Sequence, residues 1–124
     1  MSTQCGVAIK TEKGYETIYV HSDGYPEYML PMLTENYNSE ELAAKLVSLG
    51  DASFIDRKLE PTSDHHKFGT PEPDVCVFYH RDREEDLHTT LYPTKAELCS
   101  CYYYSYVWKD GSWHFYKGGN LINY

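Results

Sequence analysis

Long apolar segments are missing from the sequence. No run approaches the length of about 20 apolar residues that a membrane-spanning helix needs, and residues 1–20 contain no apolar core of a secretory signal peptide. The four cysteines are therefore expected to be reduced thiols in a cytoplasmic protein rather than disulfides. At 124 residues, the chain is expected to form one domain that spans residues 1–124.

Recognisable catalytic and cofactor motifs are also missing. The sequence has no Gly-x-Ser-x-Gly nucleophile elbow, no Gly-x₄-Gly-Lys-Ser/Thr or Gly-x-Gly-x-x-Gly phosphate loop, and no Asp-x-Asp-x-Asp-Gly calcium loop. Cys99 and Cys101 are separated by one residue, which is closer than the Cys-x₂₋₄-Cys spacing of structural zinc sites. We therefore expect no bound metal, no cofactor and no set of catalytic residues.

Basic residues are outnumbered by acidic ones. The chain has 11 Lys and Arg against 19 Asp and Glu, which gives a net charge of −8 at pH 7. A surface this acidic repels nucleic acid and anionic lipid, so neither is expected as a direct partner. It attracts basic surfaces, including a protein groove built to hold nucleic acid. The alternative interpretation is that the charge only keeps the protein in solution.

Phenylalanine and tryptophan are scarce, with 4 Phe and 2 Trp against 13 Tyr. Tyrosine joins an apolar ring to a polar hydroxyl, which suits half-buried sheet faces and protein interfaces. Tyr104, Tyr106 and Trp108 share one face of a predicted strand, and we expect one face of this strand to be open. These three residues are therefore candidate binding residues. The alternative is that their rings only stiffen a hairpin through cross-strand pairs.

Hydrophobic periodicity and turn residues predict pairs of strands that are interrupted by helices. The predicted strands are Gly6–Lys10, Tyr15–His21, Val75–His80, Leu87–Leu91, Tyr102–Trp108 and Trp113–Lys117. The predicted helices are Tyr28–Tyr37, a helix between Asn38 and Gly50, and Lys95–Cys101 with Thr94 as its cap. Residues 60–73 are predicted to form a long loop. The predicted fold class is α+β, with an antiparallel sheet built from hairpins and two or three helices packed on one face.

The segment from His21 to Glu27 concentrates polar and aromatic side chains between a strand and a helix. Its candidate binding residues are His21, Asp23, Tyr25 and Glu27. An imidazole beside a carboxylate also permits general-base chemistry, so a small hydrolase centred on His21 and Asp23 is one alternative. No nucleophile in a recognisable setting accompanies them, which favours binding over catalysis.

The same segment has the composition of a tight turn. Gly24 and Pro26 are predicted turn residues that join the first hairpin to a helix beginning near Tyr28. We expect a positive φ at Gly24, an extended backbone at Tyr25 and a trans peptide bond before Pro26. Under this interpretation Asp23 bonds backbone amides, and the segment is a structural joint.

Arginine occurs at only three positions, Arg57, Arg81 and Arg83. If these side chains converged beside aromatic rings, they would bind the phosphates and base of a small nucleotide signal. This sponge-type binding is a second alternative function. The neighbouring Asp82 and Glu84 favour local ion pairs instead.

Residues 19–37, Tyr-Val-His-Ser-Asp-Gly-Tyr-Pro-Glu-Tyr-Met-Leu-Pro-Met-Leu-Thr-Glu-Asn-Tyr, resemble a pattern in small phage and prophage proteins. In that pattern, a strand ending in Tyr-x-His is followed by x-Asp-Gly-Tyr-Pro and by a helix that ends near Tyr-Asn. The similarity continues to Gly50-Asp51 and returns at residues 78–83, where the pattern is Phe-Tyr-x-Arg-Asp-Arg-Gly. Glu84 stands where the pattern has Gly. The resemblance covers about half of the chain. Tyr79, Arg81 and Arg83, which lie in its second segment, are also candidate binding residues.

The resemblance implies a protein of mobile-element origin in the cytoplasm of a bacterial host cell. Many small acidic proteins of this kind are counter-defence factors that inhibit nucleases such as CRISPR effectors or sequester nucleotide signals. We therefore expect a non-enzymatic, anti-CRISPR-like protein whose acidic, Tyr-rich surface binds a host defence protein. It is expected to be a monomer or a small homo-oligomer.

Overall fold

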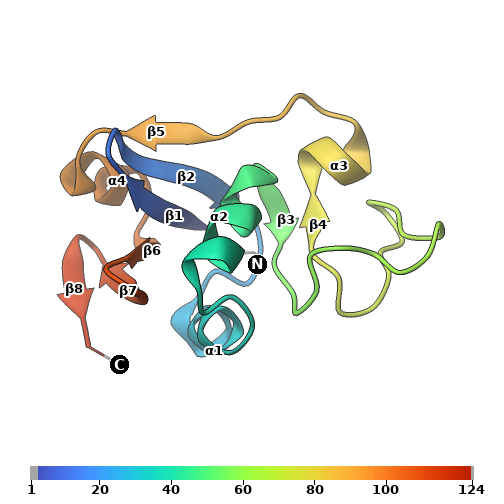
Figure 1. The fold of residues 1–124 in the computed structure, drawn as a ribbon, viewed down its shortest axis with the longest axis horizontal. Helices are drawn as coiled ribbons and strands as arrows, with labels where there is room; N and C mark the ends of the chain where they lie inside the picture. Colours follow the sequence, from blue (N-terminus) through green and yellow to red (C-terminus); the bar gives the residue numbers. More distant parts are fainter. Residues whose placement is uncertain (1–2, 124) are drawn as a thin grey trace.

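A mixed β-sheet forms the centre of the computed structural model, which describes residues 3–123 (Figure 1). Its strands are β1 (Cys5–Thr11), β2 (Gly14–Val20), β3 (Ala52–Phe54), β4 (Val77–Phe78), β5 (Thr90–Tyr92), β6 (Tyr104–Lys109), β7 (Ser112–Lys117) and β8 (Asn120–Ile122). The helices are α1 (Pro26–Asn36), α2 (Glu40–Ser48), α3 (Tyr79–Arg83) and α4 (Lys95–Cys101). The strand order is β4-β3-β2-β1-β6-β7-β8, and β5 pairs separately with β2. The predicted α+β class is confirmed.

The sheet is not built from antiparallel hairpins alone. β1 and β2 pair antiparallel, as do β6 and β7, which confirms the two predicted hairpins. However, β1 pairs with β6 in parallel, and β2 pairs with β3 in parallel. The expectation of a purely antiparallel sheet is wrong because α1 and α2 form a crossover after β2, so β3 returns in the same direction as β2.

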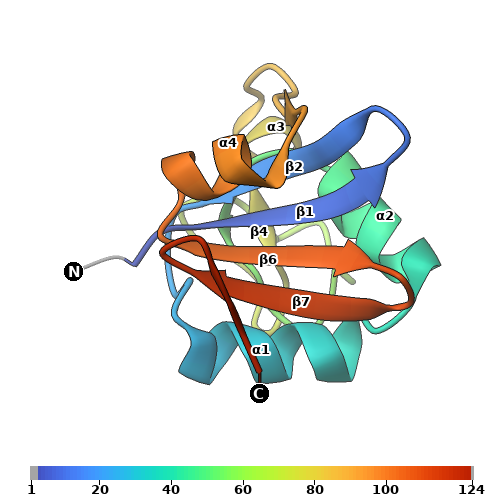
Figure 2. The same ribbon diagram turned by 90° about the vertical axis from the view of Figure 1, so that its left-hand side faces the viewer.

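Helices cover both faces of the sheet (Figure 2). On one face, α1 and α2 bury Met29, Leu33 and Leu46 in the main core. On the opposite face, α4 buries Leu98 against a second cluster that includes Val107. The prediction that all helices pack on one face is therefore wrong, because the short α4 crosses the other face between β5 and β6.

β6 is buried on both of its sides. Tyr106 and Trp108 belong to the main core and are 0% and 5% exposed. Ser105 and Val107, which alternate with them, are both 0% exposed. The expectation of an open face on this strand is wrong because α4 adds a third layer over the sheet.

Several element boundaries differ from the predicted ones. α1 begins at Pro26 rather than at Tyr28, since proline needs no N–H partner in the first turn of a helix. The predicted strand Val75–His80 is reduced to β4, and the chain then enters α3. The predicted strand Leu87–Leu91 is displaced to β5, which pairs with β2 and not with β4. The sequence pattern predicts neither β3 nor β8.

The predicted long loop contains no helix or strand, as expected. His66 of this loop places its Nε2 atom 3.2 Å from the Asp82 carboxylate, and its Nδ1 atom accepts a hydrogen bond from the Glu72 N–H at 3.0 Å. The Phe68 ring packs on Tyr79 with a centroid distance of 5.4 Å. These contacts hold the loop against α3.

Candidate functional site

Gly24 joins the first hairpin to α1 through close packing against β1. A Cβ atom added at Gly24 would lie 2.7 Å from the Cys5 Cβ atom and 2.9 Å from the Cys5 backbone nitrogen. The Gly24 N–H donates to the Thr3 carbonyl at 2.8 Å, and the Gly24 carbonyl accepts from the buried Tyr106 hydroxyl at 2.7 Å. Glycine is needed here because two chain segments approach each other closely.

The backbone of this turn differs from the prediction at one residue. The positive φ lies at Asp23 (58°) and not at Gly24, because aspartate tolerates the left-handed region better than most residues. Tyr25 is extended, with φ −75° and ψ 151°, as predicted. No cis peptide bond occurs within residues 3–123, so Pro26 is trans, also as predicted. The Asp23 side chain is exposed. Within residues 3–123 it accepts no hydrogen bond from a backbone amide, so the expected bonds from Asp23 to the backbone are not formed.

His21 is held by a tyrosine rather than by a carboxylate. The Tyr19 hydroxyl lies 2.6 Å from His21 Nδ1, and the two rings are 6.0 Å apart. Among the described residues, no hydrogen bond or ion pair joins His21 to Asp23 or Glu27. Catalysis by a His21–Asp23 pair needs the carboxylate to orient the imidazole, and the observed geometry does not supply that contact.

Asp51 is a structural hub for which the sequence carries no signal. Its Oδ1 atom accepts from the Tyr19 N–H at 2.9 Å, and its Oδ2 atom lies 2.7 Å from His88 Nδ1. Its backbone N–H donates to the His88 carbonyl at 3.0 Å, and its carbonyl accepts from the Tyr79 N–H at 3.2 Å. The carboxylate fills the gap on β2 between the residues that pair with β3 and those that pair with β5. Asp51 therefore connects β2, α3 and the segment that leads into β5.

Two of the three arginines form ion pairs at the surface. Arg57 pairs with Asp74 at 2.6 Å, and Arg83 pairs with Glu85 at 3.0 Å. A phosphate group would have to displace these carboxylates before it could bind. The side chains of Arg57 and Arg83 are therefore already occupied by carboxylates. Their positions do not support the alternative that the protein binds a nucleotide.

Arg81 is engaged by its own neighbours. Its guanidinium donates to the Asp82 carboxylate at 2.9 Å and to the Cys76 carbonyl at 2.8 Å. Burial alone would raise the pKa of the Asp82 carboxyl, but the hydrogen bonds that it accepts from Arg81 and from the Phe78 N–H outweigh burial and lower this pKa. Arg81 and Asp82 thus connect α3 to the chain before β4.

The aromatic residues near β6 differ in their access to solvent. Tyr104 is half-buried, whereas Tyr106 and Trp108 lie in the core. The Trp108 ring packs edge-to-face on Trp113 with a centroid distance of 5.6 Å. Tyr103, which is not among the candidates predicted from the sequence, is 59% exposed. A partner on the surface of the folded protein would reach Tyr103 and Tyr104 but neither Tyr106 nor Trp108.

A series of exposed carboxylates follows α1 and the beginning of α2. Between Gly14 and Ala44 the chain has six acidic residues and no lysine or arginine. Five of the six are exposed, and we call them the acidic α1–α2 surface: Asp23, Glu27, Glu35, Glu40 and Glu41. Within residues 3–123, no ion pair involves any of the five. None of the five carboxylates is therefore held in an ion pair by another described residue.

The carboxylates of this surface extend along α1. Glu27, Pro31 and Glu35 are exposed at intervals of four residues, so the two glutamates are separated by about 12 Å along the helix axis. The start of α2 lies just beyond the C-terminal end of α1 (Figure 2). Tyr25, at the N-terminal end, is 37% exposed and packs 6.2 Å from Tyr28. The structure thus places three sequence-derived candidates, Asp23, Tyr25 and Glu27, at one end of the acidic α1–α2 surface.

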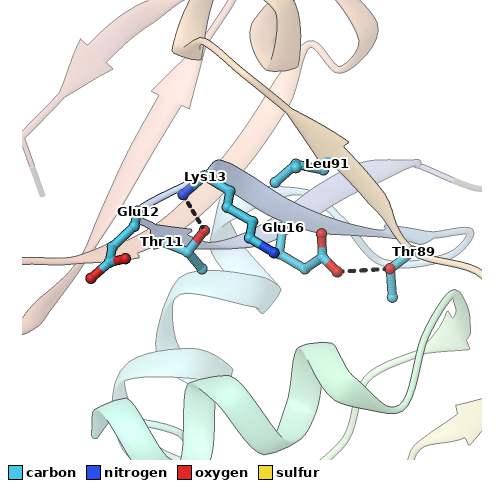
Figure 3. A pocket seen from close by; sticks show the side chains of 6 residues that line it. All are labelled: Thr11, Glu12, Lys13, Glu16, Thr89 and Leu91. Carbon is cyan, nitrogen blue, oxygen red and sulfur yellow. Dashed lines mark hydrogen bonds between the residues drawn. The ribbon is translucent and has the colours of Figure 1, made fainter.

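A groove of about 640 Å³ lies beside the turn between β1 and β2 (Figure 3). The residues that line it are Thr11, Glu12, Lys13, Glu16, Thr89 and Leu91. The Glu16 carboxylate accepts a hydrogen bond from the Thr89 hydroxyl at 3.0 Å, which joins β2 to the segment before β5. None of the candidate residues chosen from the sequence lines this groove.

Metal binding and membrane insertion find no support in the described part of the chain. Residues 3–123 contain no group of three His, Cys, Asp or Glu side chains that is placed to hold a metal ion. No helix in the same range is long and apolar enough to span a bilayer. Comparisons with protein-family models, curated proteins and solved structures found no match.

Proposed function

We propose that the protein is a non-enzymatic, phage-type counter-defence factor that inhibits a host nuclease or another nucleic-acid-binding defence protein. In this proposal the acidic α1–α2 surface occupies the basic groove in which the partner holds nucleic acid. The observation that carries the proposal is a set of five exposed carboxylates that form no ion pair within residues 3–123, in a stretch that has no lysine or arginine.

Charge complementarity explains how such a surface selects its partner. A groove that binds nucleic acid is lined by lysine and arginine, and opposite charges speed the encounter and fix the orientation of the complex. Glu27 and Glu35 lie on the same side of α1, so they meet such a groove on a helix that is already formed.

Tyr25 supplies an anchor of a different kind. Tyrosine is enriched among the residues that contribute most to binding energy at interfaces, because its ring buries apolar area and its hydroxyl forms a hydrogen bond. Tyr25 stands between Asp23 and Glu27 and is 37% exposed. It therefore adds contact area at the end of the surface where two carboxylates already lie.

The proposal also draws on the resemblance to phage and prophage proteins, which includes the segment from Tyr19 to Tyr37 and thus all of α1. A protein of that origin would act in the cytoplasm of the infected bacterium, where RNA-guided nucleases and other defence proteins present basic grooves. Inhibition by occupation of the groove requires no catalytic residues and no cofactor.

The test is a capture experiment with the full chain. Immobilised protein is incubated with nuclease-treated lysate of bacteria that express RNA-guided nucleases, at about 50 mM and about 500 mM salt. We expect a nucleic-acid-binding protein to be retained at the lower salt and its retention to fall at least about tenfold at the higher salt. Excess duplex DNA should release the same protein, because both compete for one groove. Retention that responds to neither salt nor DNA would overturn the proposal.

A further inference from the structure

β8 is an edge strand without the features that usually prevent one sheet from pairing with another. It is the last strand in the sheet order, and all three of its residues are exposed. Leu121 and Ile122 are 55% and 36% exposed. The strand contains no charged residue and no proline, which are common means of blocking an edge.

The backbone of β8 is also oriented for pairing. Gly118 and Gly119, with φ of 59° and 88°, form a two-residue turn between β7 and β8. The residues that flank such a turn exchange hydrogen bonds, and the pairs then alternate along the ladder. Leu121 faces Tyr116 one step further along, so its N–H and carbonyl point away from β7, toward the open edge.

The edge formed by β5 is protected. The segment before β5 carries Glu84, Glu85 and Asp86, all exposed, and the strand is followed directly by Pro93. Charges and proline on an edge disfavour strand addition. At the other end of the sheet order, β4 is buried, which leaves β8 as the exposed edge that accepts another strand.

The negative charge of the chain lies outside the region around β8, which favours a second copy of this protein as the source of the added strand. Residues 98–124 contain Lys109, Lys117 and a single acidic residue, Asp110, for a net charge of +1. Residues 1–97 therefore carry a net charge of −9. Two copies of this acidic protein repel each other over most orientations, but not when their β8 edges meet.

We propose that the protein self-associates through β8, with the β8 strands of two copies pairing antiparallel about a two-fold axis. Leu121 of one copy lies opposite Leu121 of the other, and their outward backbone groups exchange hydrogen bonds. The two sheets become one continuous sheet, and the exposed side chains of Leu121 and Ile122 pack against the second copy. Such an isologous contact closes at two subunits.

The two-fold axis has a consequence for the acidic α1–α2 surface. An axis perpendicular to the sheet places the α1 helices of both copies on the same face, so the dimer carries that surface twice on one side. Self-association through β8 does not depend on the proposed function, because its contacts are apolar and backbone contacts. High salt therefore preserves the dimer, whereas it weakens capture of a basic partner.

The contact between three-residue strands is small, so the dimer is weak and depends on concentration. Sedimentation velocity of the full chain from about 10 μM to about 1 mM tests the proposal. We expect the weight-average mass to rise from the monomer value of 14.4 kDa toward twice that value. The rise should persist at about 500 mM salt.

Two variants and one control identify the edge. Leu121→Glu places a charge on the edge, and Leu121→Pro removes the outward N–H; both should keep the monomer mass at every concentration. Leu91→Glu changes a comparably exposed leucine on β5 and should associate like the wild type. A wild-type protein that stays monomeric to the highest concentration would overturn the proposal, as would an equal loss of association in Leu91→Glu.

Discussion

Replacing Gly24 with valine is expected to destabilise the protein by about 3 kcal/mol, the upper part of the range for overpacked positions. The new Cβ atom would lie within 3 Å of the Cβ, nitrogen and Sγ atoms of Cys5. Cys5 is fully buried in β1, so neither segment has room to move away. Separation of the two segments would also break the hydrogen bond from Tyr106 to the Gly24 carbonyl. Thermal unfolding should show a fall in melting temperature of about 10 °C.

Substitutions at Asp23 and Gly24 distinguish the cost of close packing from the cost of a strained backbone. Asp23 has the positive φ of this turn, so Asp23→Gly should leave the stability unchanged or raise it by about 0.5 kcal/mol. If the turn depended on backbone freedom at residue 24 alone, Gly24→Ala and Gly24→Val would cost the same. The packing account instead predicts a graded loss from alanine to valine. A Gly24→Val protein that melts like the wild type would contradict it.

Replacing Asp51 with alanine is expected to lower the free energy of unfolding by about 3 kcal/mol. The substitution removes the acceptor of the half-buried Tyr19 N–H and the partner of His88. The Tyr19 N–H then has no acceptor, because Tyr19 lies on β2 between the residues that pair with β3 and those that pair with β5. Urea unfolding followed by circular dichroism measures the loss.

Asp51→Asn is the control for this change. Its amide oxygen still accepts from the Tyr19 N–H, so we expect a loss of only about 1 kcal/mol. Equal losses for the alanine and asparagine variants would mean that the negative charge, and not the hydrogen bond to β2, is what stabilises this junction.

The sequence predicts those elements that are stabilised by residues close to one another along the chain. The β1–β2 and β6–β7 hairpins follow from alternation of side chains and from turn residues. The cap of α4 also follows, since the Thr94 side chain accepts from the Glu97 N–H as the spacing predicts. These features need only contacts between residues a few positions apart.

Long-range pairing was not predictable in the same way. The parallel pair of β1 and β6 joins residues about a hundred positions apart, and side-chain periodicity carries no information about such partners. The three-residue strands β3 and β8 are too short to show a period. α4 then covers a face of the sheet that alternation alone leaves open, which is why Val107 is buried as well as Tyr106 and Trp108 on the opposite face.

The candidate site follows from the sequence only in part. The segment from Asp23 to Glu27 is polar and turn-like, and the structure leaves these two residues and Tyr25 exposed. Glu35 and Glu40 join them because the start of α2 lies just beyond the C-terminal end of α1 (Figure 2). No short motif encodes that arrangement. The absence of lysine and arginine between Gly14 and Ala44 is the sequence signal from which it could have been found.

The most direct test of the proposed binding surface compares two double variants of equal net charge in the capture experiment. Glu27→Gln/Glu35→Gln neutralises two carboxylates of the acidic α1–α2 surface, whereas Glu84→Gln/Glu97→Gln neutralises two exposed carboxylates outside it. We expect the first variant to lose at least about tenfold of the DNA-competable retention, which corresponds to about 1.4 kcal/mol. The second should retain the partner like the wild type. Equal retention by the two variants would contradict the account, because binding would then depend on total charge and not on this surface.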